Sequence, residues 1–265
     1  MKKTFSKISL FSLLAILVIL GCEKNKDNVF SDYIAIDDTY AFLKVNYNVP
    51  FYNDPFVQVK INDVRVSGTN IQTRYPFPGG GFNTLGGSTG DYLPVKPSPT
   101  TKISVTIPKK GTNIDSIDVY TTTVATVAGG HYSLHVADSL SRKGLFVGED
   151  YSLPDSGFVR MRFVNLMPTA GPLDLYVGTN KVASNVSFMT ITDSFLVPTS
   201  QAAISTSWTI RTAGSAPTST AIATYSTASS LLNRRVYTAF ACGYVTYPSS
   251  GADKRRPFIA FYYVR

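Results

Sequence analysis

The sequence predicts an all-β protein made of two tandem β-sandwich domains. Three observations support this fold: apolar and polar residues alternate along many short stretches, turn-forming residues separate these stretches, and one residue pattern occurs twice. Of the 265 residues, 44% are hydrophobic, 16% are charged and 12% are aromatic. A disordered chain would be less apolar and less aromatic, and two cysteines are too few for a disulfide-stabilised miniprotein.

The first 21 residues, 1–21, have the features of a secretory signal peptide. Three lysines come before an uncharged apolar run from Ile8 to Leu20. As a helix this run would reach about 20 Å, whereas the hydrocarbon core of a bilayer is roughly 30 Å thick. The run is therefore too short for a comfortable membrane span, and it fits the apolar region of a signal peptide.

The end of the apolar run resembles the lipobox of bacterial lipoproteins, because Gly21 is followed by Cys22. The resemblance implies cleavage before Cys22 and acylation of its sulfur and its new amino group, and two or three acyl chains give a stable anchor. We therefore expect an outer-membrane lipoprotein of a diderm bacterium, on the cell surface or on the periplasmic face. The alternative is a cysteine buried in an N-terminal membrane helix. Residues 22–39 are polar and are expected to form a tether.

The rest of the chain is interpreted as a duplication. Phe42 aligns with Phe158 at an offset of 116 residues, and the offset later falls to 103 because the first copy has an insertion within 75–90. A repeat of this length predicts tandem domains rather than a solenoid. The predicted segments are a first β-sandwich domain at 40–150, a linker at 151–157 and a second β-sandwich domain at 158–265.

Within each copy, apolar residues recur at every second position. This period predicts strands with one face in a core and the other in solvent. The clearest strands are expected at 42–47, 57–61, 103–107 and 145–147 in the first copy, and at 158–163, 173–177 and 258–264 in the second. Turns are expected at Asn62-Asp63, Lys110-Gly111, Gly178-Thr179-Asn180 and Ala213-Gly214.

The second copy resembles the bacterial envelope family known as domain of unknown function 4397. The matching motif residues are Arg162, Pro168, Asp174, Tyr176, Val177 and Gly178, with Leu175 in place of the usual valine. The first copy departs further, with Gln58, Lys60 and Asn62 in place of the aspartate, tyrosine and glycine. The resemblance implies an immunoglobulin-like or transthyretin-like sandwich on exported lipoproteins, and it implies no activity.

The few residues suited to catalysis or metal binding have ordinary structural explanations. His131 and His135 lie on a predicted strand, about 13 Å apart, too far to bind one ion. Cys242, in an apolar stretch, is expected to be a buried hydrophobic residue. The carboxylate pairs Asp37-Asp38 and Glu149-Asp150 are expected to be solvated, with a weak calcium site as the alternative. We therefore expect no catalytic residue, no metal and no cofactor.

The insertion in the first copy is rich in glycine and aromatic residues. Gly79-Gly80-Gly81 lacks the Lys-Ser/Thr pair and the helix of a phosphate-binding loop. Aromatic side chains on loops of a rigid scaffold often hold sugars or peptides. The candidate ligand-binding residues of the loop 75–92 are Tyr75, Phe77, Phe82 and Tyr92. The alternative is that these rings cover the core of the first domain.

Basic residues occupy matching turns before the last strand of each copy, at Arg142-Lys143 and Lys254-Arg255-Arg256. We expect charged hairpin tips, with contact to anionic lipid or lipopolysaccharide phosphate as the alternative. The full chain has 25 basic and 17 acidic residues, a net charge of +8, and loss of the three signal-peptide lysines lowers it to +5. This excess is too small to indicate nucleic-acid binding by an exported protein.

Together these features predict a non-catalytic, lipid-anchored binding module for a glycan, a peptide or an envelope protein. The first alternative is a structural or assembly subunit of a surface appendage or envelope complex, joined through sheet edges. A remote alternative is a hydrolase with an unrecognised site, although no Gly-x-Ser-x-Gly nucleophile elbow occurs.

Overall fold

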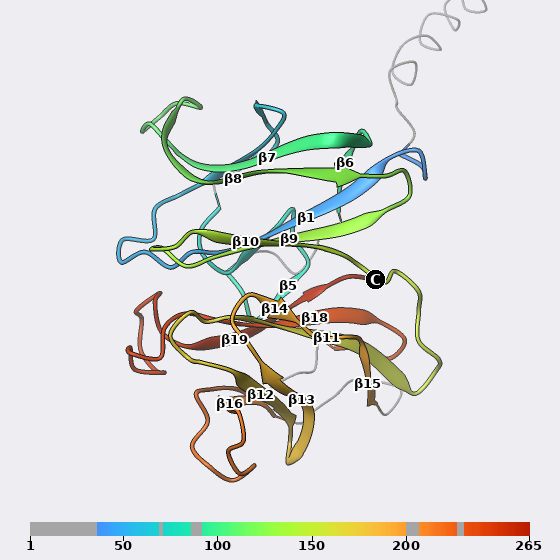
Figure 1. Ribbon diagram of the computed structural model, residues 1–265, viewed down its shortest axis with the longest axis vertical. Helices are drawn as coiled ribbons and strands as arrows, with labels where there is room; N and C mark the ends of the chain where they lie inside the picture. Colours follow the sequence, from blue (N-terminus) through green and yellow to red (C-terminus); the bar gives the residue numbers. More distant parts are fainter. Residues whose placement is uncertain (1–35, 69–70, 86–91, 200–206, 227–230) are drawn as a thin grey trace, which may run out of the picture. The chain divides into compact units, whose positions relative to one another are not determined.

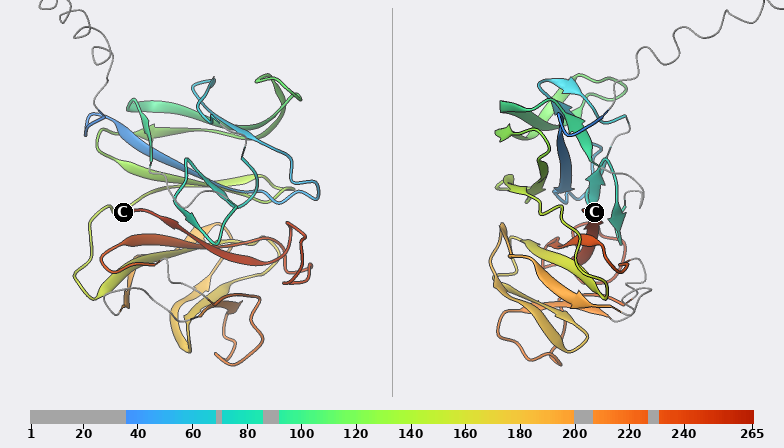
Figure 2. Two further views of the ribbon diagram at one scale, coloured as in Figure 1. Left: turned by 180° about the vertical axis from the view of Figure 1, so that it is seen from behind. Right: turned by 90° about the vertical axis from the view of Figure 1, so that its right-hand side faces the viewer.

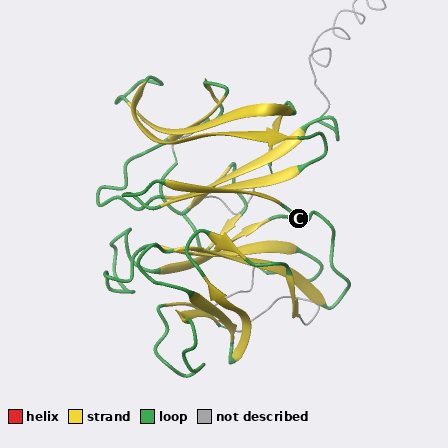
Figure 3. Cartoon of the chain, in the orientation of Figure 1, coloured by secondary structure: helices red, strands yellow, loops and turns green. Residues whose placement is uncertain are grey.

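The described part of the chain consists of strands and loops, without a helix, which confirms the predicted all-β class (Figure 3). This computed structural model describes residues 36–68, 71–85, 92–199, 207–226 and 231–265. The predicted signal peptide, Cys22 and most of the predicted tether lie outside the described residues. Asp37 and Asp38, at the start of the described part, are exposed as predicted.

Two sheets build the first half, residues 38–150 (Figure 1). One sheet has the order β10-β9-β1-β4, with β6 also paired to β1, and the other has the order β3-β2-β7-β8. The strands are β1 (Ala41–Asn48), β2 (Gln58–Ile61), β3 (Val64–Arg65), β4 (Tyr75–Phe77), β5 (Gly81–Phe82), β6 (Leu93–Val95), β7 (Ser98–Pro108), β8 (Asp115–Thr126), β9 (His131–Ala137) and β10 (Lys143–Gly148).

The second half, residues 158–265, has the same strand order. One sheet has the order β14-β11-β18-β19-β5, with β15 also paired to β11, and the other has the order β13-β12-β16-β17. In both halves the first strand pairs in parallel with a later one, β1 with β9 and β11 with β18. The strands are β11 (Phe158–Leu166), β12 (Leu173–Val177), β13 (Asn180–Val186), β14 (Thr190–Ile191), β15 (Phe195–Pro198), β16 (Trp208–Thr212), β17 (Ala223–Tyr225), β18 (Val236–Cys242) and β19 (Phe258–Tyr263).

The two sheets of each half form two layers (Figure 2), and a separate apolar core lies between them. In the first half, Leu43 and Val45 of β1 pack against residues of β7, such as Ile103. In the second half, Phe163 of β11 packs in the same cluster as Trp208 of β16. Because full burial of such side chains contributes about 1.5–3 kcal/mol each, the alternating apolar positions supply most of the stabilisation of both sandwiches.

Residues with positive φ close the predicted turns. Asn62 and Asp63 have φ values of 48° and 67°, and they connect β2 to β3. Positive φ at both central residues is the geometry of a two-residue type I′ turn, which matches the twist of the flanking strands. Gly111 and Gly178, with φ values of 73° and 60°, also lie in predicted turns.

Strand β1 is buried on both faces, which corrects the expectation that it has one solvent face. Leu43 and Tyr47 face the first core, whereas Phe42 packs against a third cluster that contains residues of both halves, among them Ala137 and Tyr262. The polar side chain of Lys44, on the same face as Phe42, is fully buried. The alternation predicts correctly which side chains face the first core, but the second half covers the face that a lone sandwich would leave in water.

The insertion of the first half joins a sheet of the second half. Strand β4 pairs with β1, and β5 then pairs with the edge of β19. Tyr263 N donates to Gly80 O at 2.8 Å. A Cβ on Gly81 would approach Thr84 Oγ1 to 2.1 Å and Pro76 Cγ to 2.8 Å, so a larger residue here would displace side chains within the insertion.

Residues 38–265 cluster as one compact unit. The last residues are part of it, because Val236 N donates to Arg265 O at 2.6 Å. Within the described ranges, no helix is long and apolar enough to cross a bilayer.

Candidate functional site

The four aromatic residues predicted to bind a ligand are distributed among three cores. Phe77 and Tyr92 are buried, with exposed fractions of 8% and 6%. Tyr75 packs against the core of the first half and Phe82 against that of the second. Instead of lining one open surface, these rings fill space within and between the two sandwiches.

Both histidines lie on β9, as predicted, and both are held by neighbouring side chains. His135 is fully buried, with Nδ1 3.1 Å from Asn46 Nδ2 and Nε2 3.3 Å from Tyr262 OH. Burial, with a contribution from the charge of Arg162, lowers the pKa of His135 to about 3. The ring of His131 stacks with that of Tyr151, with centroids 3.6 Å apart. Among the described residues, no group of three or more His, Cys, Asp or Glu side chains is placed to hold a metal ion.

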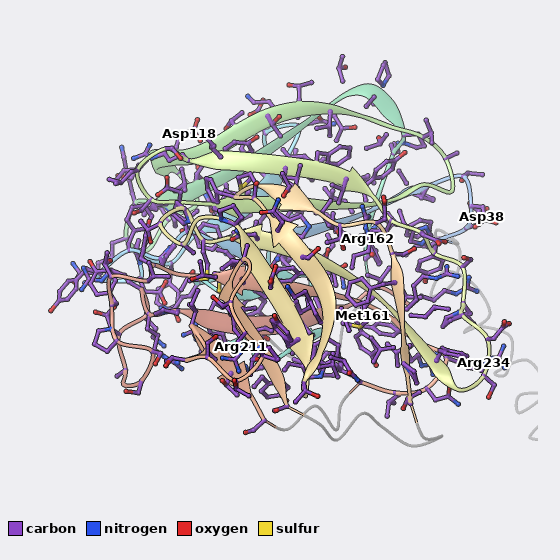
Figure 4. All side chains as sticks on the ribbon, turned by 60° about the horizontal axis from the view of Figure 1, so that its bottom comes forward. Asp38, Asp118, Met161, Arg162, Arg211 and Arg234 are labelled. Carbon is purple, nitrogen blue, oxygen red and sulfur yellow. The ribbon has the colours of Figure 1, made fainter. Side chains whose placement is uncertain are left out.

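Glu149 is not solvated, in contrast to the sequence-based expectation. Its side chain is 1% exposed, and Oε1 accepts a hydrogen bond from Tyr262 OH at 2.8 Å. Arg162, which is labelled in Figure 4, has its Nη1 3.4 Å from Oε2 and also donates to Gly148 O. Residues of β11 and β19 therefore cover this carboxylate. Asp150 is more exposed and forms an ion pair with Arg160 at 2.5 Å.

The family motif around Asp174 has a structural role. Its carboxylate accepts hydrogen bonds from Asn185 N at 2.8 Å and Gly214 N at 3.0 Å, and it lies 2.6 Å from Lys181 Nζ. Burial opposes ionisation, but these donors hold the pKa of Asp174 below its usual value. Tyr176 OH donates to Ser215 O at 2.9 Å. The motif thus fixes turns of the β13-β12-β16-β17 sheet.

A groove of about 350 Å³ brings together loops from both halves. The first half contributes the segment after β1 and the turn after β9, and the second half contributes Thr169 and the segment between β18 and β19. We call it the aromatic groove, and its lining residues are Pro50, Phe51, Tyr52, Ser139, Leu140, Thr169, Tyr244, Thr246, Tyr247 and Arg255.

Exposed apolar surface and a fixed cation meet in the aromatic groove. Tyr52 and Leu140 have exposed fractions of 74% and 87%. The Arg255 guanidinium lies 4.7 Å from the ring centroid of Tyr52 and 4.1 Å from that of Tyr247. Asp253 holds this guanidinium through two hydrogen bonds, Nε to Oδ1 at 3.0 Å and Nη2 to Oδ2 at 2.8 Å. The hydrogen bonds from Arg255 lower the pKa of Asp253 to about 2.

Hydrogen bonds between the halves set the base of the groove. Tyr244 OH donates to Asp138 Oδ1 at 3.0 Å and accepts from Ser139 N at 3.0 Å. The Asp138 carboxylate is partly buried, which opposes ionisation, but donors such as Ser141 keep its pKa below the usual value. Tyr244 of the second half is therefore tied to the turn after β9 of the first half. A groove held by such contacts is largely formed before a ligand arrives.

A second hollow of about 440 Å³ continues from Phe51 and Tyr52 towards Ile107 and Ile117. Ile117 has an exposed fraction of 46%, so the continuation is also apolar. The sequence predicts Arg255 as part of a charged hairpin tip, with contact to anionic lipid or lipopolysaccharide phosphate as the alternative, and it does not single out Tyr52 or Tyr247. The sequence feature that could have indicated these residues is the concentration of aromatic and turn-forming residues in the loop after β1 and in the loop after β18.

Residues 159–253 match the family described as a domain of unknown function (DUF4397). This match confirms the resemblance predicted for the second copy. It covers Thr169, Tyr244 and Tyr247 of the groove, whereas Tyr52 and Arg255 lie outside it. A search of curated proteins finds no match for the chain.

Proposed function

We propose that this chain, whose residues 159–253 match a family without an assigned activity, is a lipid-anchored envelope protein that acts as a non-catalytic binding module. Its ligand, a glycan, a peptide or a protein segment, would occupy the aromatic groove. One observation carries the proposal: the largely exposed ring of Tyr52 lies beside the guanidinium of Arg255, which Asp253 fixes in place.

The groove has the chemistry of a binding site. Tyrosine rings offer a broad apolar face together with a hydroxyl group, and they lose little conformational entropy when a ligand packs on them. A guanidinium already held by a carboxylate keeps further N–H donors for a ligand oxygen. A ligand with flat apolar faces and polar edges, such as a sugar or an aromatic peptide side chain, would satisfy both features.

The environments of the reactive side chains support a non-catalytic role. His135 is buried and neutral, with both ring nitrogens near polar partners. Burial raises the pKa of the Cys242 thiol to about 12, which suppresses the thiolate needed of a nucleophile. Neither residue lines the groove.

The proposed anchor rests on the sequence of the first 22 residues. Lipidation of Cys22 would place the protein in the outer membrane, at the cell surface or facing the periplasm, and residues 22–39 would separate the lipid from the sandwiches. A Cys22→Ala variant that fractionates with membranes at an unchanged size would contradict this anchor.

Truncation of exposed side chains inside the groove, compared with truncation of an exposed leucine outside it, tests whether the groove binds the ligand. We would measure retention of the full chain in native gels containing soluble polysaccharides, and binding to peptidoglycan and to a labelled peptide library. Leu140→Ala and Tyr52→Ala are expected to weaken binding at least about tenfold, as contact residues do. Leu196→Ala removes a side chain that is 51% exposed on β15 and serves as the matched control. Equal binding by all variants would contradict a site in the groove.

A second candidate function, a subunit of an envelope assembly, is favoured by the edge strand β8. This strand has 12 residues and ends its sheet, and within the described chain it pairs only with β7. Its part from Val119 to Thr126 has no charge, and long edges of this kind can pair with another strand. Self-association in sedimentation experiments that Thr123→Lys abolishes would support this role.

A further inference from the structure

Another pocket, of about 340 Å³, lies on the segment between β18 and β19 and shares no lining residue with the aromatic groove. Basic side chains from both halves meet in it: Arg74 from the first half, and Lys254 and Arg256 from the second. The remaining lining residues are Asn83, Thr84, Leu85, Gly251, Ala252 and Phe258. We call it the basic pocket.

Arg74 is unusual for a basic residue because it is only 6% exposed. Its Nε is buried and has no hydrogen-bond partner in the described part of the chain. The guanidinium instead lies 4.1 Å from the ring centroid of Phe258. Cation–π contact offsets part of the cost of burying a charge, but it leaves the buried Nε of Arg74 without an acceptor among the described residues.

Arg256 lies near the same ring, with its guanidinium 4.6 Å from the Phe258 centroid. Arg256 Nη1 donates to Ser249 O at 3.0 Å. Burial, together with the like charge of Arg74, lowers the pKa of Arg256 from its usual value. Two cations that repel each other at one ring are stabilised by an anion that contacts both.

Among the described residues, none of the three basic side chains of the pocket forms an ion pair within 4.0 Å. Asp54 is the carboxylate whose field acts on Lys254 and Arg74, but none of the ion pairs within 4.0 Å in the described chain involves it. Asp54 Oδ1 accepts a hydrogen bond from Thr73 N at 3.1 Å. Three cations and one carboxylate leave two positive charges at this site.

We propose that the basic pocket binds a phosphate group, with Arg74, Arg256 and Lys254 as its ligands. A phosphate monoester carries about −1.5 to −2 charge near neutral pH and offers three acceptor oxygens, which matches the excess of two positive charges better than a carboxylate does. Guanidinium groups suit phosphate because they can donate two parallel hydrogen bonds. The two sources of such a group are a lipid headgroup and a soluble phosphate.

Calorimetric titration of the full chain in detergent with inorganic phosphate tests the proposal, with sodium chloride at equal ionic strength as the blank. We expect saturable binding to one site. Lys254→Gln and Arg256→Gln are expected to weaken it about tenfold, because each removes a hydrogen bond between charged groups. Lys109→Gln removes the same charge from an exposed position outside the pocket and should leave binding unchanged.

Thermal unfolding of each variant, without phosphate, verifies that it folds. Absence of saturable binding, or equal loss in Lys109→Gln, would overturn the proposal. Arg74→Gln is informative only if it melts as a cooperative unit, and the two partly exposed residues carry the test if it does not. Vesicles containing phosphatidic acid distinguish the two sources: retention lost in the same variants identifies a lipid headgroup, whereas phosphate binding without retention identifies a soluble phosphate.

Discussion

Lys44 Nζ, on β1 of the first half, donates a hydrogen bond to Tyr263 O, on β19 of the second half, at 3.0 Å. The same ammonium donates to Gly79 O at 3.1 Å and lies 4.7 Å from the ring centroid of Tyr92. The fully buried ammonium of Lys44 therefore links strand β1, on which it lies, to the insertion and to the last strand. These contacts join the two sandwiches.

Lys44→Ala is expected to destabilise the protein by about 2–4 kcal/mol, because it opens a cavity and leaves the carbonyl groups of Gly79 and Tyr263 without this donor. The free energy of urea unfolding measures this loss. Lys109→Ala, at an exposed position, should change it by less than about 0.5 kcal/mol. A similar small effect for both variants would show that Lys44 does not stabilise the contact between the halves.

Gly243→Ala is expected to destabilise the protein more than Gly251→Ala. Both glycines have positive φ, 93° and 100°, so both substitutions strain the backbone. A Cβ at Gly243 would also lie 2.0 Å from Arg256 O, whereas at Gly251 no atom lies within 4 Å. We expect the first variant to lose about 2 kcal/mol more in thermal or urea unfolding. Equal losses would mean that the chain at Gly243 relaxes freely.

Phe77→Ala is expected to cost about 3–5 kcal/mol of unfolding free energy, as truncation of a buried aromatic residue does. The same variant, where it remains folded, should bind polysaccharides and peptides as the wild type does, because Phe77 does not line the aromatic groove. Loss of ligand binding without loss of stability would restore the sequence-based candidate site at 75–92.

His135 should make stability depend on pH. Its pKa is about 3 in the folded protein and 6.5 in the unfolded chain, so the unfolded state takes up a proton first as the pH falls. The contribution of the neutral ring is therefore complete above pH 6.5 and decreases as the pH falls towards 3, with a slope approaching about 1.4 kcal/mol per pH unit. His135→Gln should lack this part of the slope between pH 6 and about 4 in urea unfolding. An unchanged slope would refute the assignment.

Cys242 should be unreactive in the folded protein, because burial raises the pKa of its thiol to about 12. A thiol reagent such as Ellman's reagent is expected to react with it only after unfolding in urea. Rapid reaction of the native protein would show that the third core, in which Cys242 packs, opens readily.

The sequence contained enough to predict the strands and the facing of their side chains. Alternation from Phe42 to Tyr47 correctly assigned Leu43 and Val45 to the first core. It could not predict burial of Lys44, because the atoms that cover this side chain belong to distant residues such as Gly79 and Tyr263, 35 and 219 positions away, and periodicity indicates only the face of the strand on which a side chain lies. For the same reason the sequence could not show that Phe82 packs against the second half.

The candidate site was harder to predict than the fold. Tyr52 lies in a turn without periodicity, so neither a strand nor a core pattern distinguishes it. The contact between Tyr52 and Arg255 depends on how the loop after β1 and the loop after β18 approach each other. By contrast, Asn62 and Asp63 were identified correctly as a turn because their chemistry acts locally.

Photo-crosslinking in intact cells tests the proposed binding role most directly. Leu140→benzoylphenylalanine places a photoreactive group in the aromatic groove, and Leu196→benzoylphenylalanine places one on β15. We expect a discrete crosslinked product from position 140 that is absent from position 196 and is lost when Tyr52→Ala is added. The absence of a product at position 140, or the same products from both positions, would contradict a ligand site in this groove.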